Sequence, residues 1–260
     1  PEHRARKRFG QHFLHDRGVV HRILEAFDPQ PHETVVEIGP GRGALTGALL
    51  ERVPHLHAVE LDRDLAARLR AAWPPEQLTV HEADALRFDF CSLAAAGERL
   101  RIVGNLPYNI STPLLFHLLA QRRCIHDLLF MLQKEVVDRI CAGPGGRDYG
   151  RLSVMLQWRF EVEKLFDVRP GAFTPPPKVD SRILRLVPRA VPAVQVTDDE
   201  RFARLVQAAF GQRRKTLRNT LRDVVSEAGF AAAGIDPARR AETLTLAEFA
   251  ALANTVPTHT

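Results

Sequence analysis

Residues 105–108 place an amide, a proline and an aromatic ring directly after an apolar run. The Asn105 side-chain oxygen and the Leu106 carbonyl can accept the two hydrogens of an amino group whose lone pair is delocalised into a ring, as in N6 of adenine. Accepting both hydrogens lets that nitrogen become pyramidal and attack a methyl donor. Pro107 fixes φ at roughly −65° and holds the carbonyl in place, and Tyr108 offers a flat face for a base. A plain turn is the alternative interpretation.

Three glycines, Gly39, Gly41 and Gly43, stand between an apolar run and a helical pattern. Glycine lets the backbone approach a ligand closely, and the N-terminus of a helix offers unpaired N–H groups. Further along the chain, Glu60 ends a second apolar run, where its carboxylate can accept both hydroxyls of a ribose. Sites for NAD and for S-adenosylmethionine both fit this spacing, and a purely structural turn is a third interpretation.

Asp84 ends a third apolar run, where a carboxylate can hold an adenine amino group, although a helix cap explains it equally well. A glycine loop, a ribose acid and an adenine acid on three successive strands resemble the class I S-adenosylmethionine-dependent methyltransferases. A dehydrogenase would need a hydride-transfer site on the later strands, and no group of residues suggests one. The resemblance therefore implies S-adenosyl-L-methionine as the cofactor.

Eight motifs occur in order across nearly the whole chain. They are "KRFGQHFL", "VEIGPGRGALT", "ELDRDLAARL", "GNLPYNIST", "FMLQKEVVDRI", "YGRLSVMLQ", "FTPPPKVDS" and "FGQRRKTLRN". Together they resemble the small-subunit ribosomal RNA adenine N6,N6-dimethyltransferases, the kasugamycin-sensitivity enzymes of bacteria. The resemblance implies dimethylation of adenines in 16S ribosomal RNA, at two adjacent positions near the 3′ end, linked to maturation of the small subunit.

The resemblance also implies a set of site residues. The cofactor-binding positions are Gln11, His12, Leu14, Gly39, Gly41, Glu60, Asp84 and Asn105, and His12 stands where many relatives carry Asn. The catalytic positions are Asn105, Leu106, Pro107, Tyr108 and Phe173. We expect Phe173 to pack against the face of the target adenine opposite Tyr108, so that a flipped base lies between two rings. Without the resemblance, Phe173 is equally well explained as a loop aromatic packed onto the core.

Other functions remain open. Large-subunit ribosomal RNA methyltransferases that confer macrolide resistance share the fold and a similar Asn-x-Pro-aromatic motif, but "FTPPPKVDS" and "FGQRRKTLRN" favour the small-subunit enzyme. A DNA adenine methyltransferase more usually carries Asp or Asn followed by Pro-Pro before the aromatic residue. A non-catalytic RNA-binding assembly factor is expected to have lost Asn105, Glu60 or the glycines, all of which are present.

A sheet must bring these residues together, and the apolar pattern predicts one. Short apolar runs alternate with helical spacings, at 34–39, 56–61, 78–84, 101–105 and 128–132. Continuous apolar strands suit a parallel sheet covered on both faces, so we expect a doubly wound α/β catalytic domain over residues 1–190. Two further strands, near 162–168 and 182–187, flank a proline-rich loop, and the pattern leaves their direction open.

Helix signals dominate the chain after Pro192, and we expect a small all-helical RNA-binding domain over 191–260. Two pairs match the capping-box pattern at a helix start, Thr197 with Glu200 and Thr245 with Glu248. One apolar helix face is expected to be formed by Phe202, Leu205, Val206 and Ala209.

Basic residues gather near both ends of the chain, at 4–8 and at 201–222. We expect Arg214, Arg218 and Arg222 to share one helix face that follows a phosphate backbone without reading bases. A solvated helix face is the alternative. A folded ribosomal RNA, within a ribosomal subunit or its precursor, is the partner that these clusters and the resemblance imply.

Composition narrows the class of protein. A hydrophobic share of 45% and a charged share of 26% in 260 residues are typical of a soluble globular chain. The three cysteines lack C-x-x-C spacing, so we expect reduced cysteines and no metal site. No apolar run approaches membrane-spanning length, and the basic N-terminus lacks the apolar segment of a signal peptide. We therefore expect a cytoplasmic monomer.

Overall fold

The computed structural model describes residues 11–256, so the basic run at 4–8 lies outside the described residues. The described residues pack into two compact units. The first contains the described residues through Val137 together with Glu163–Pro188, and the second contains Asp138–Val162 and the described residues from Arg189 onward.

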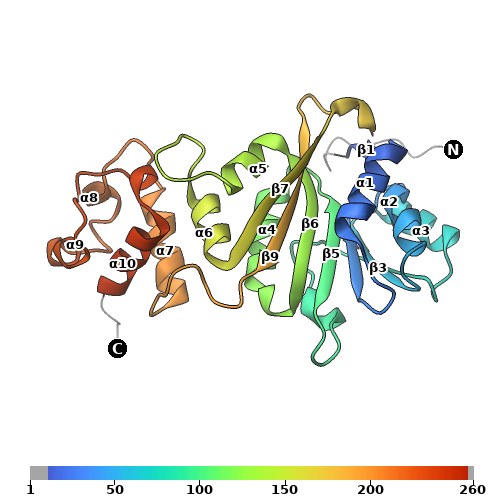
Figure 1. Cartoon of the computed structure of the whole chain (residues 1–260), viewed down its shortest axis with the longest axis horizontal. Helices are drawn as coiled ribbons and strands as arrows, with labels where there is room; N and C mark the ends of the chain where they lie inside the picture. The colour runs from blue at the N-terminus through green and yellow to red at the C-terminus, as the bar shows by residue number, and fades with distance from the viewer. Residues whose placement is uncertain (1–10, 257–260) are drawn as a thin grey trace. The chain divides into compact units, whose positions relative to one another are not determined.

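A seven-stranded sheet follows the order β4-β3-β2-β5-β6-β9-β7 (Figure 1). Its strands are β2 (Val35–Ile38), β3 (Leu56–Glu60), β4 (Leu78–Glu82), β5 (Leu100–Asn105), β6 (Ile125–Gln133), β7 (Phe160–Val168) and β9 (Ser181–Pro188). Neighbours from β4 to β6 are parallel, and β9 is antiparallel to β6. The five predicted apolar strands are confirmed. A second, two-stranded sheet pairs β1 (Phe13–Leu14) with β8 (Phe173–Thr174).

Helices cover both faces of the large sheet, and Figure 1 shows α1 in front of the strands and α4 behind them. The helices of the first unit are α1 (Arg17–Phe27), α2 (Ala44–Leu50), α3 (Arg63–Ala72) and α4 (Ser111–Ala120). Asp16 caps α1 by accepting a hydrogen bond from the Val19 N–H. The buried face of α1, with Leu24 and Phe27, packs into the same core as Val103 of β5. Covered on both faces, the sheet can consist of continuous apolar strands.

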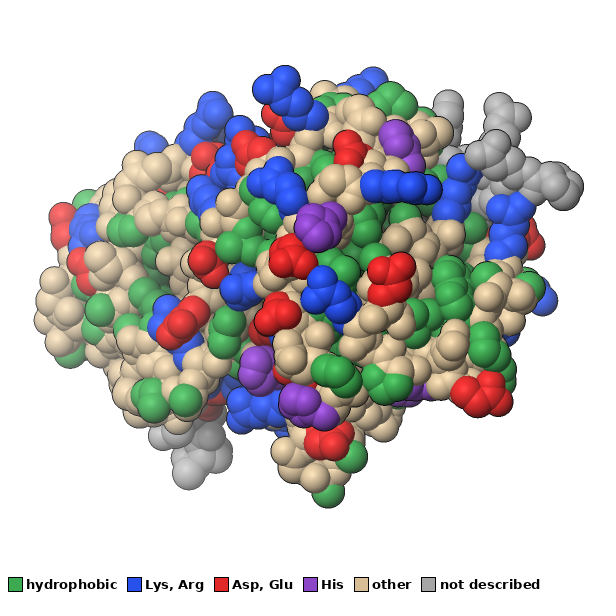
Figure 2. All heavy atoms as spheres, turned by 45° about the vertical axis from the view of Figure 1, so that its right-hand side comes forward, with side chains coloured by type: hydrophobic (Ala, Val, Ile, Leu, Met, Phe, Trp, Pro, Cys, Tyr) green, Lys and Arg blue, Asp and Glu red, His purple; other side chains and the backbone are tan. Residues whose placement is uncertain are grey.

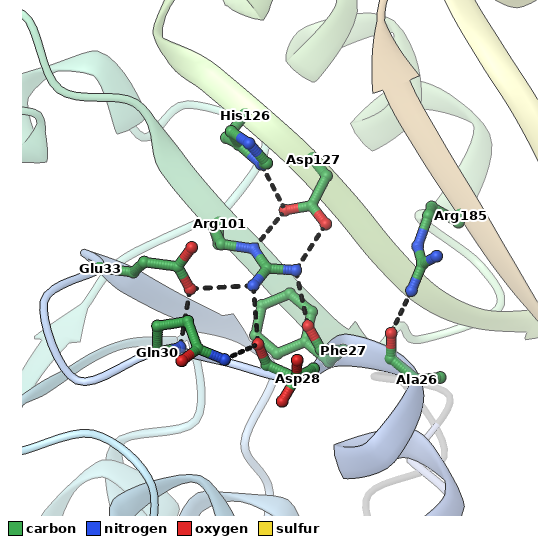
Figure 3. A network of polar contacts seen from close by, with 9 residues as sticks. All are labelled: Ala26, Phe27, Asp28, Gln30, Glu33, Arg101, His126, Asp127 and Arg185. Carbon is green, nitrogen blue, oxygen red and sulfur yellow. Dashed lines mark hydrogen bonds and ion pairs between the residues drawn. The ribbon is translucent and has the colours of Figure 1, made fainter.

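Arg101, on β5, ties the end of α1 to the sheet (Figure 3). Its guanidinium donates to both carboxylate oxygens of Asp127 at 2.8 Å and to Glu33 at 2.9 Å. The same group donates to the carbonyls of Phe27 and Asp28, at the C-terminal end of α1. These carbonyls have no partner within a helix. Arg101 therefore satisfies them while its own charge is balanced by two carboxylates.

Residues 134–140 form α5 (Lys134–Ile140), and the second unit is helical. Its helices are α6 (Arg151–Arg159), α7 (Asp199–Ala209), α8 (Leu217–Thr220), α9 (Glu227–Ala233) and α10 (Leu246–Thr255). The apolar face predicted for α7 is buried, and the capping box of Thr245 and Glu248 opens α10. Trp158 of α6 packs on Phe202 of α7 with ring centroids 4.5 Å apart. This contact joins Asp138–Val162 to the C-terminal helices.

The other predicted capping box is wrong by one residue. The N-cap of α7 is Asp198, whose carboxylate accepts from the Arg201 N–H at 2.9 Å. Thr197 instead bonds to the Asn254 side chain, through its backbone N–H at 2.9 Å. A carboxylate next to the helix start competes with the threonine hydroxyl for the same role.

The predicted basic helix face is also wrong. Helix α8 covers only Leu217–Thr220, so Arg214 and Arg222 lie outside it. Its first N–H groups, at Leu217 and Arg218, donate to the carbonyls of Arg239 and Pro237 at 2.8 and 2.9 Å. Tertiary hydrogen bonds thus replace the preceding helical turn. Arg218 and Arg222 also form surface ion pairs, with Glu227 and Asp223 respectively.

The cysteine prediction fails for two of three residues. Cys91 and Cys124 form a disulfide across a Cα–Cα distance of 5.4 Å, linking η2 (Phe90–Leu93) to η3 (Arg122–Cys124), while Cys141 is not disulfide-bonded. Over residues 11–256, no helix combines the length and apolar character needed to cross a membrane. The same residues contain no group of three or more His, Cys, Asp or Glu side chains arranged to hold a metal.

Candidate active site

A cavity opens at the carboxyl ends of the parallel strands β2 to β5, where a doubly wound sheet usually binds its ligand. Nearly all the expected catalytic and cofactor-binding residues line it. They are Gln11, His12, Leu14, Gly39, Gly41, Glu60, Asp84, Asn105, Leu106, Pro107 and Tyr108. Phe173 is the exception.

The glycine loop requires its glycines. Gly39 and Gly41 have φ angles of 66° and 57°, in the left-handed region that side chains rarely adopt. A Cβ on Gly41 would also lie 3.0 Å from the Phe13 ring. The loop therefore keeps its backbone close to the cavity, with α2 beginning directly after it.

Glu60 presents a fixed carboxylate to the cavity. Its side chain is almost completely buried, and one oxygen accepts from the Asp62 N–H at 2.8 Å. The other oxygen accepts from the Gly41 N–H at 3.2 Å. Burial raises the pKa of Glu60, and these two backbone hydrogen bonds oppose the rise. The glycine loop and the β3 acid are thus joined, because the loop orients the carboxylate through Gly41.

A second carboxyl group on the cavity wall was not predicted from the sequence. Glu37, on β2, is 2% exposed and accepts a hydrogen bond from the Thr46 hydroxyl at 2.6 Å. Burial raises the pKa of Glu37 to about 8, with the nearby Glu60 adding to the rise. Glu37 is therefore protonated at neutral pH. Its position inside a continuous apolar strand was the signal that could have found it.

Two further polar contacts shape the cavity wall. Asp84 uses one carboxylate oxygen to accept from the Leu86 N–H at 2.9 Å, a local turn after β4. The Gln11 side-chain amide donates to Asp62 at 3.2 Å, and Asp62 also caps α3. Asp62 is thus a site residue that the sequence reasoning missed, and it fixes Gln11.

Asn105 ends β5 and is oriented by the segment that enters β1. Its side-chain nitrogen donates to the His12 carbonyl at 3.0 Å. Because only the amide nitrogen can donate to a carbonyl, the amide is fixed with its oxygen free to accept. The Leu106 N–H donates to the Met131 carbonyl at 3.2 Å. Asn105 and Leu106 are thus anchored through donors, and two acceptors stand side by side in the chain.

Tyr108 is held at its hydroxyl and on one ring face. The hydroxyl groups of Tyr108 and Ser181 share a hydrogen bond of 2.6 Å. The rings of Tyr108 and His12 lie with centroids 5.3 Å apart and planes tilted by 33°. Burial raises the pKa of Tyr108, and the Ser181 hydrogen bond opposes the rise. The phenol therefore stays protonated at neutral pH.

Phe173 lies away from this cavity. Its side chain is 2% exposed and belongs to the core cluster that contains Leu14, Leu24 and Phe27. Phe173 pairs with Leu14 across the β1–β8 ribbon. In this structure the ring beside Tyr108 is that of His12, so the expected pairing of Phe173 with Tyr108 around a base is not formed.

Charge is mixed on the face of the molecule drawn in Figure 2. Figure 2 shows basic and acidic side chains interspersed on the face turned toward the viewer. Arg42, next to Gly41 in the loop, stacks its guanidinium over the Phe13 ring at 4.6 Å.

Comparison with known families decides the identity of the chain. The model of the family described as ribosomal RNA adenine dimethylase matches residues 2–257. The chain belongs to this family. Both the resemblance noted from the sequence and the expected enzyme class, a ribosomal RNA adenine dimethyltransferase, are therefore confirmed.

Members with curated names are close in sequence. The chain is 63% identical over 250 residues to the "Ribosomal RNA small subunit methyltransferase A" of Thiobacillus denitrificans, covering 96% of this chain and 97% of that protein. It is 56% identical over 254 residues to the protein of the same name from Pseudomonas aeruginosa, covering 97% and 95%.

Two solved structures share the fold. A dimethyladenosine transferase from Plasmodium falciparum matches with a TM-score of 0.75 and 26% identity, over 93% of this chain and 96% of that one. The 23S rRNA methyltransferase ErmE matches with a TM-score of 0.70 and 28% identity, over 94% and 99%. The class I methyltransferase fold expected from the sequence is confirmed.

Proposed function

We propose that this protein binds S-adenosyl-L-methionine and dimethylates N6 of adenines in small-subunit (16S) ribosomal RNA, at two adjacent positions near the 3′ end. One observation supports this function above the others. The oriented Asn105 amide and the Glu60 carboxylate line the same cavity. An acceptor pair for an exocyclic amine thus shares one cavity with a carboxylate suited to a ribose.

The residues on the cavity wall fit S-adenosylmethionine. Gly41 lets the loop backbone lie against the Phe13 ring, from which a Cβ would be only 3.0 Å away. Glu60 has both oxygens fixed by backbone N–H groups, with further lone pairs left for the two ribose hydroxyls. Asp84 keeps one carboxylate oxygen for an adenine amino group, since the other bonds to Leu86. Gln11, His12 and Leu14 complete the wall.

The reaction requires the Asn105 side chain to accept a hydrogen from N6. When bound, S-adenosylmethionine supplies an electrophilic methyl group. The Asn105 oxygen accepts one hydrogen of N6 and the Leu106 carbonyl accepts the other, so the nitrogen becomes pyramidal and its lone pair leaves the ring. As N6 forms its new bond to the methyl carbon, the bond from that carbon to the cofactor sulfur would break, and these two oxygens would stabilise the charge on the cationic nitrogen. The cation then loses a proton to water, so neither residue acts as a base.

Tyr108 provides the surface for the base. Ribosomal adenines are stacked or paired, so the enzyme receives its target as a base turned out of the stack. Stacking on an aromatic ring is worth about 1–3 kcal/mol per base. Each adenine accepts two methyl groups in turn, because a nitrogen with one methyl group keeps one hydrogen for one of the two acceptors.

The small-subunit substrate is favoured over the large-subunit one by the relatives. The curated relatives at 54–63% identity carry the small-subunit name, whereas ErmE, named for 23S rRNA, is 28% identical. We infer that the substrate is RNA within a small ribosomal subunit or its precursor. We further infer that the protein acts as a cytoplasmic monomer, with the second unit contributing RNA contacts.

Mass spectrometry tests this function directly. Small subunits that lack the modification are incubated with the purified protein and methyl-labelled S-adenosylmethionine, and their RNA is digested to nucleosides and to oligonucleotides. We expect N6,N6-dimethyladenosine in a fragment near the 3′ end of 16S RNA. Label in large-subunit RNA alone would favour the macrolide-resistance type of enzyme. No label in either RNA, despite cofactor binding, would favour a non-catalytic assembly factor.

A further inference from the structure

The segment from β8 to the start of β9 makes three attachments to the cavity wall. Its first two residues pair with β1, with Phe13 opposite Thr174 and Leu14 opposite Phe173. Next, the Pro175 carbonyl lies 2.8 Å from Nδ1 of His12. At its end, Ser181 bonds to the Tyr108 hydroxyl. Residues 173–181, here called the bracket segment, thus contact both His12 and Tyr108.

The Ser181 contact is a hydrogen bond that is buried at its serine end and partly buried at Tyr108. Ser181 has no exposed surface, and it begins β9 opposite Gln133 of β6. A hydroxyl in such a place costs free energy unless it has a partner. The Tyr108 hydroxyl is that partner at 2.6 Å, a normal length for two hydroxyl groups. The rigid sheet therefore sets the position of the phenol end of Tyr108.

The contact with His12 restrains the Tyr108 ring on one face. A centroid separation of 5.3 Å is ordinary for two rings in contact, so no base fits between them. The His12 ring is itself restrained, because Nδ1 bonds to the Pro175 carbonyl. With Nδ1 carrying the hydrogen, His12 donates to that carbonyl. A base that stacks on Tyr108 must then use the ring face turned away from His12.

We propose that Ser181 and His12 are positioning residues that fix the Tyr108 ring, so that one defined face receives the flipped adenine. This inference rests on the proposed function, since it concerns capture of the same adenine. Neither residue touches the reacting atoms in this scheme. The bracket segment then positions Tyr108. Phe173, which was expected to stack on the base, lies in the core instead.

A double-mutant cycle tests the Ser181 arm. The variants are Ser181→Ala, Tyr108→Phe and the double variant, assayed for the KM of unmodified small subunits and for kcat at saturation. Loss of one buried hydrogen bond is expected to raise KM about 5–10-fold in each single variant. The double variant should be no worse than the worse single variant, because both hydroxyls serve one bond. Multiplied effects would overturn the proposal, as would a normal KM in Ser181→Ala.

A matched control separates positioning from folding. Ser153 is another fully buried serine, and it donates to the Arg139 carbonyl in the second unit. Ser153→Ala and Ser181→Ala are expected to lower the melting temperature alike, but only Ser181→Ala should raise the KM. A higher KM in both, tracking the melting temperature, would overturn the proposal in favour of a structural role.

The His12 arm uses two replacements that remove different features of the side chain. His12→Phe keeps a ring beside Tyr108 but loses the bond to Pro175, whereas His12→Asn loses the ring. We expect His12→Asn to raise the KM for subunits more than His12→Phe does, each at saturating S-adenosylmethionine. The reverse order would overturn the proposal. If the wild-type protein forms no dimethyladenosine at all, the proposed function fails instead, and this comparison distinguishes the two failures.

Discussion

Replacing Glu37 with Gln is expected to remove a pH dependence from the stability of this protein. Glu37 is 2% exposed, and burial raises its pKa from 4.5 to about 8. Gln is neutral and nearly the same shape, and its oxygen can still accept from the Thr46 hydroxyl. The variant therefore removes the titration while keeping the packing.

The direction of this pH dependence follows from the number of protons bound in the folded and unfolded states. Between pH 4.5 and about pH 8, folded Glu37 keeps its proton while the unfolded chain has released it. The free energy of unfolding therefore falls as the pH rises through this window. The slope approaches about 1.4 kcal/mol per pH unit, so wild type should lose about 2.5 kcal/mol relative to Glu37→Gln between pH 5 and pH 7.

Urea denaturation at pH 5, 6 and 7 measures this effect, with wild type and Glu37→Gln unfolded side by side. Taking the difference between the two proteins cancels the titration of the other groups, provided that the m-values agree. We expect the free energy of unfolding of Glu37→Gln, relative to that of wild type, to increase at each step in pH. Parallel curves for the two proteins would refute the reasoning, because Glu37 would then titrate equally in the folded and unfolded states.

Two further substitutions probe the cofactor site and the sheet. Glu60→Ala should weaken S-adenosylmethionine binding by about 1.5–3 kcal/mol while leaving RNA affinity nearly unchanged, as calorimetry and filter binding can show; equal cofactor affinity would place the ribose acid elsewhere. Arg101→Met leaves the Asp127 carboxylate buried without its partner and should lower the free energy of unfolding by about 3–5 kcal/mol. The exposed pair of Arg63 and Glu82 is the control, and Arg63→Met should change stability by under about 1 kcal/mol; similar losses in both variants would contradict this account of Arg101.

Local patterns predicted the sheet and the site together. Continuous apolar runs predict parallel strands, and parallel strands bring their carboxyl ends to one edge. Glu60, Asp84 and Asn105 follow three such runs, so their convergence on one cavity is a consequence of topology. The resemblance added the positions before β1, which no periodic pattern contains.

Contacts between distant segments were not predictable in this way. Ser181 reaches Tyr108 across 73 positions, and the Cys91–Cys124 disulfide spans 33. Helical spacing at 214–222 predicted a helix that hydrogen bonds from Leu217 to Arg239 cut short. An aromatic residue after a strand, such as Phe173, fits a base site or a core equally well, and only the packing distinguishes them.

Single-turnover methyl transfer by Asn105→Ala tests whether the oriented amide stabilises the transition state at N6. The assay uses unmodified small subunits, with enzyme, RNA and S-adenosylmethionine at saturation, and resolves monomethyladenosine from dimethyladenosine. Cofactor affinity is measured by calorimetry in parallel, because Asn105 lies on the cofactor cavity. We expect a rate about 10²–10³-fold below wild type at full cofactor occupancy, since the charge on N6 loses an oriented acceptor. A near-normal rate at that occupancy would contradict this expectation.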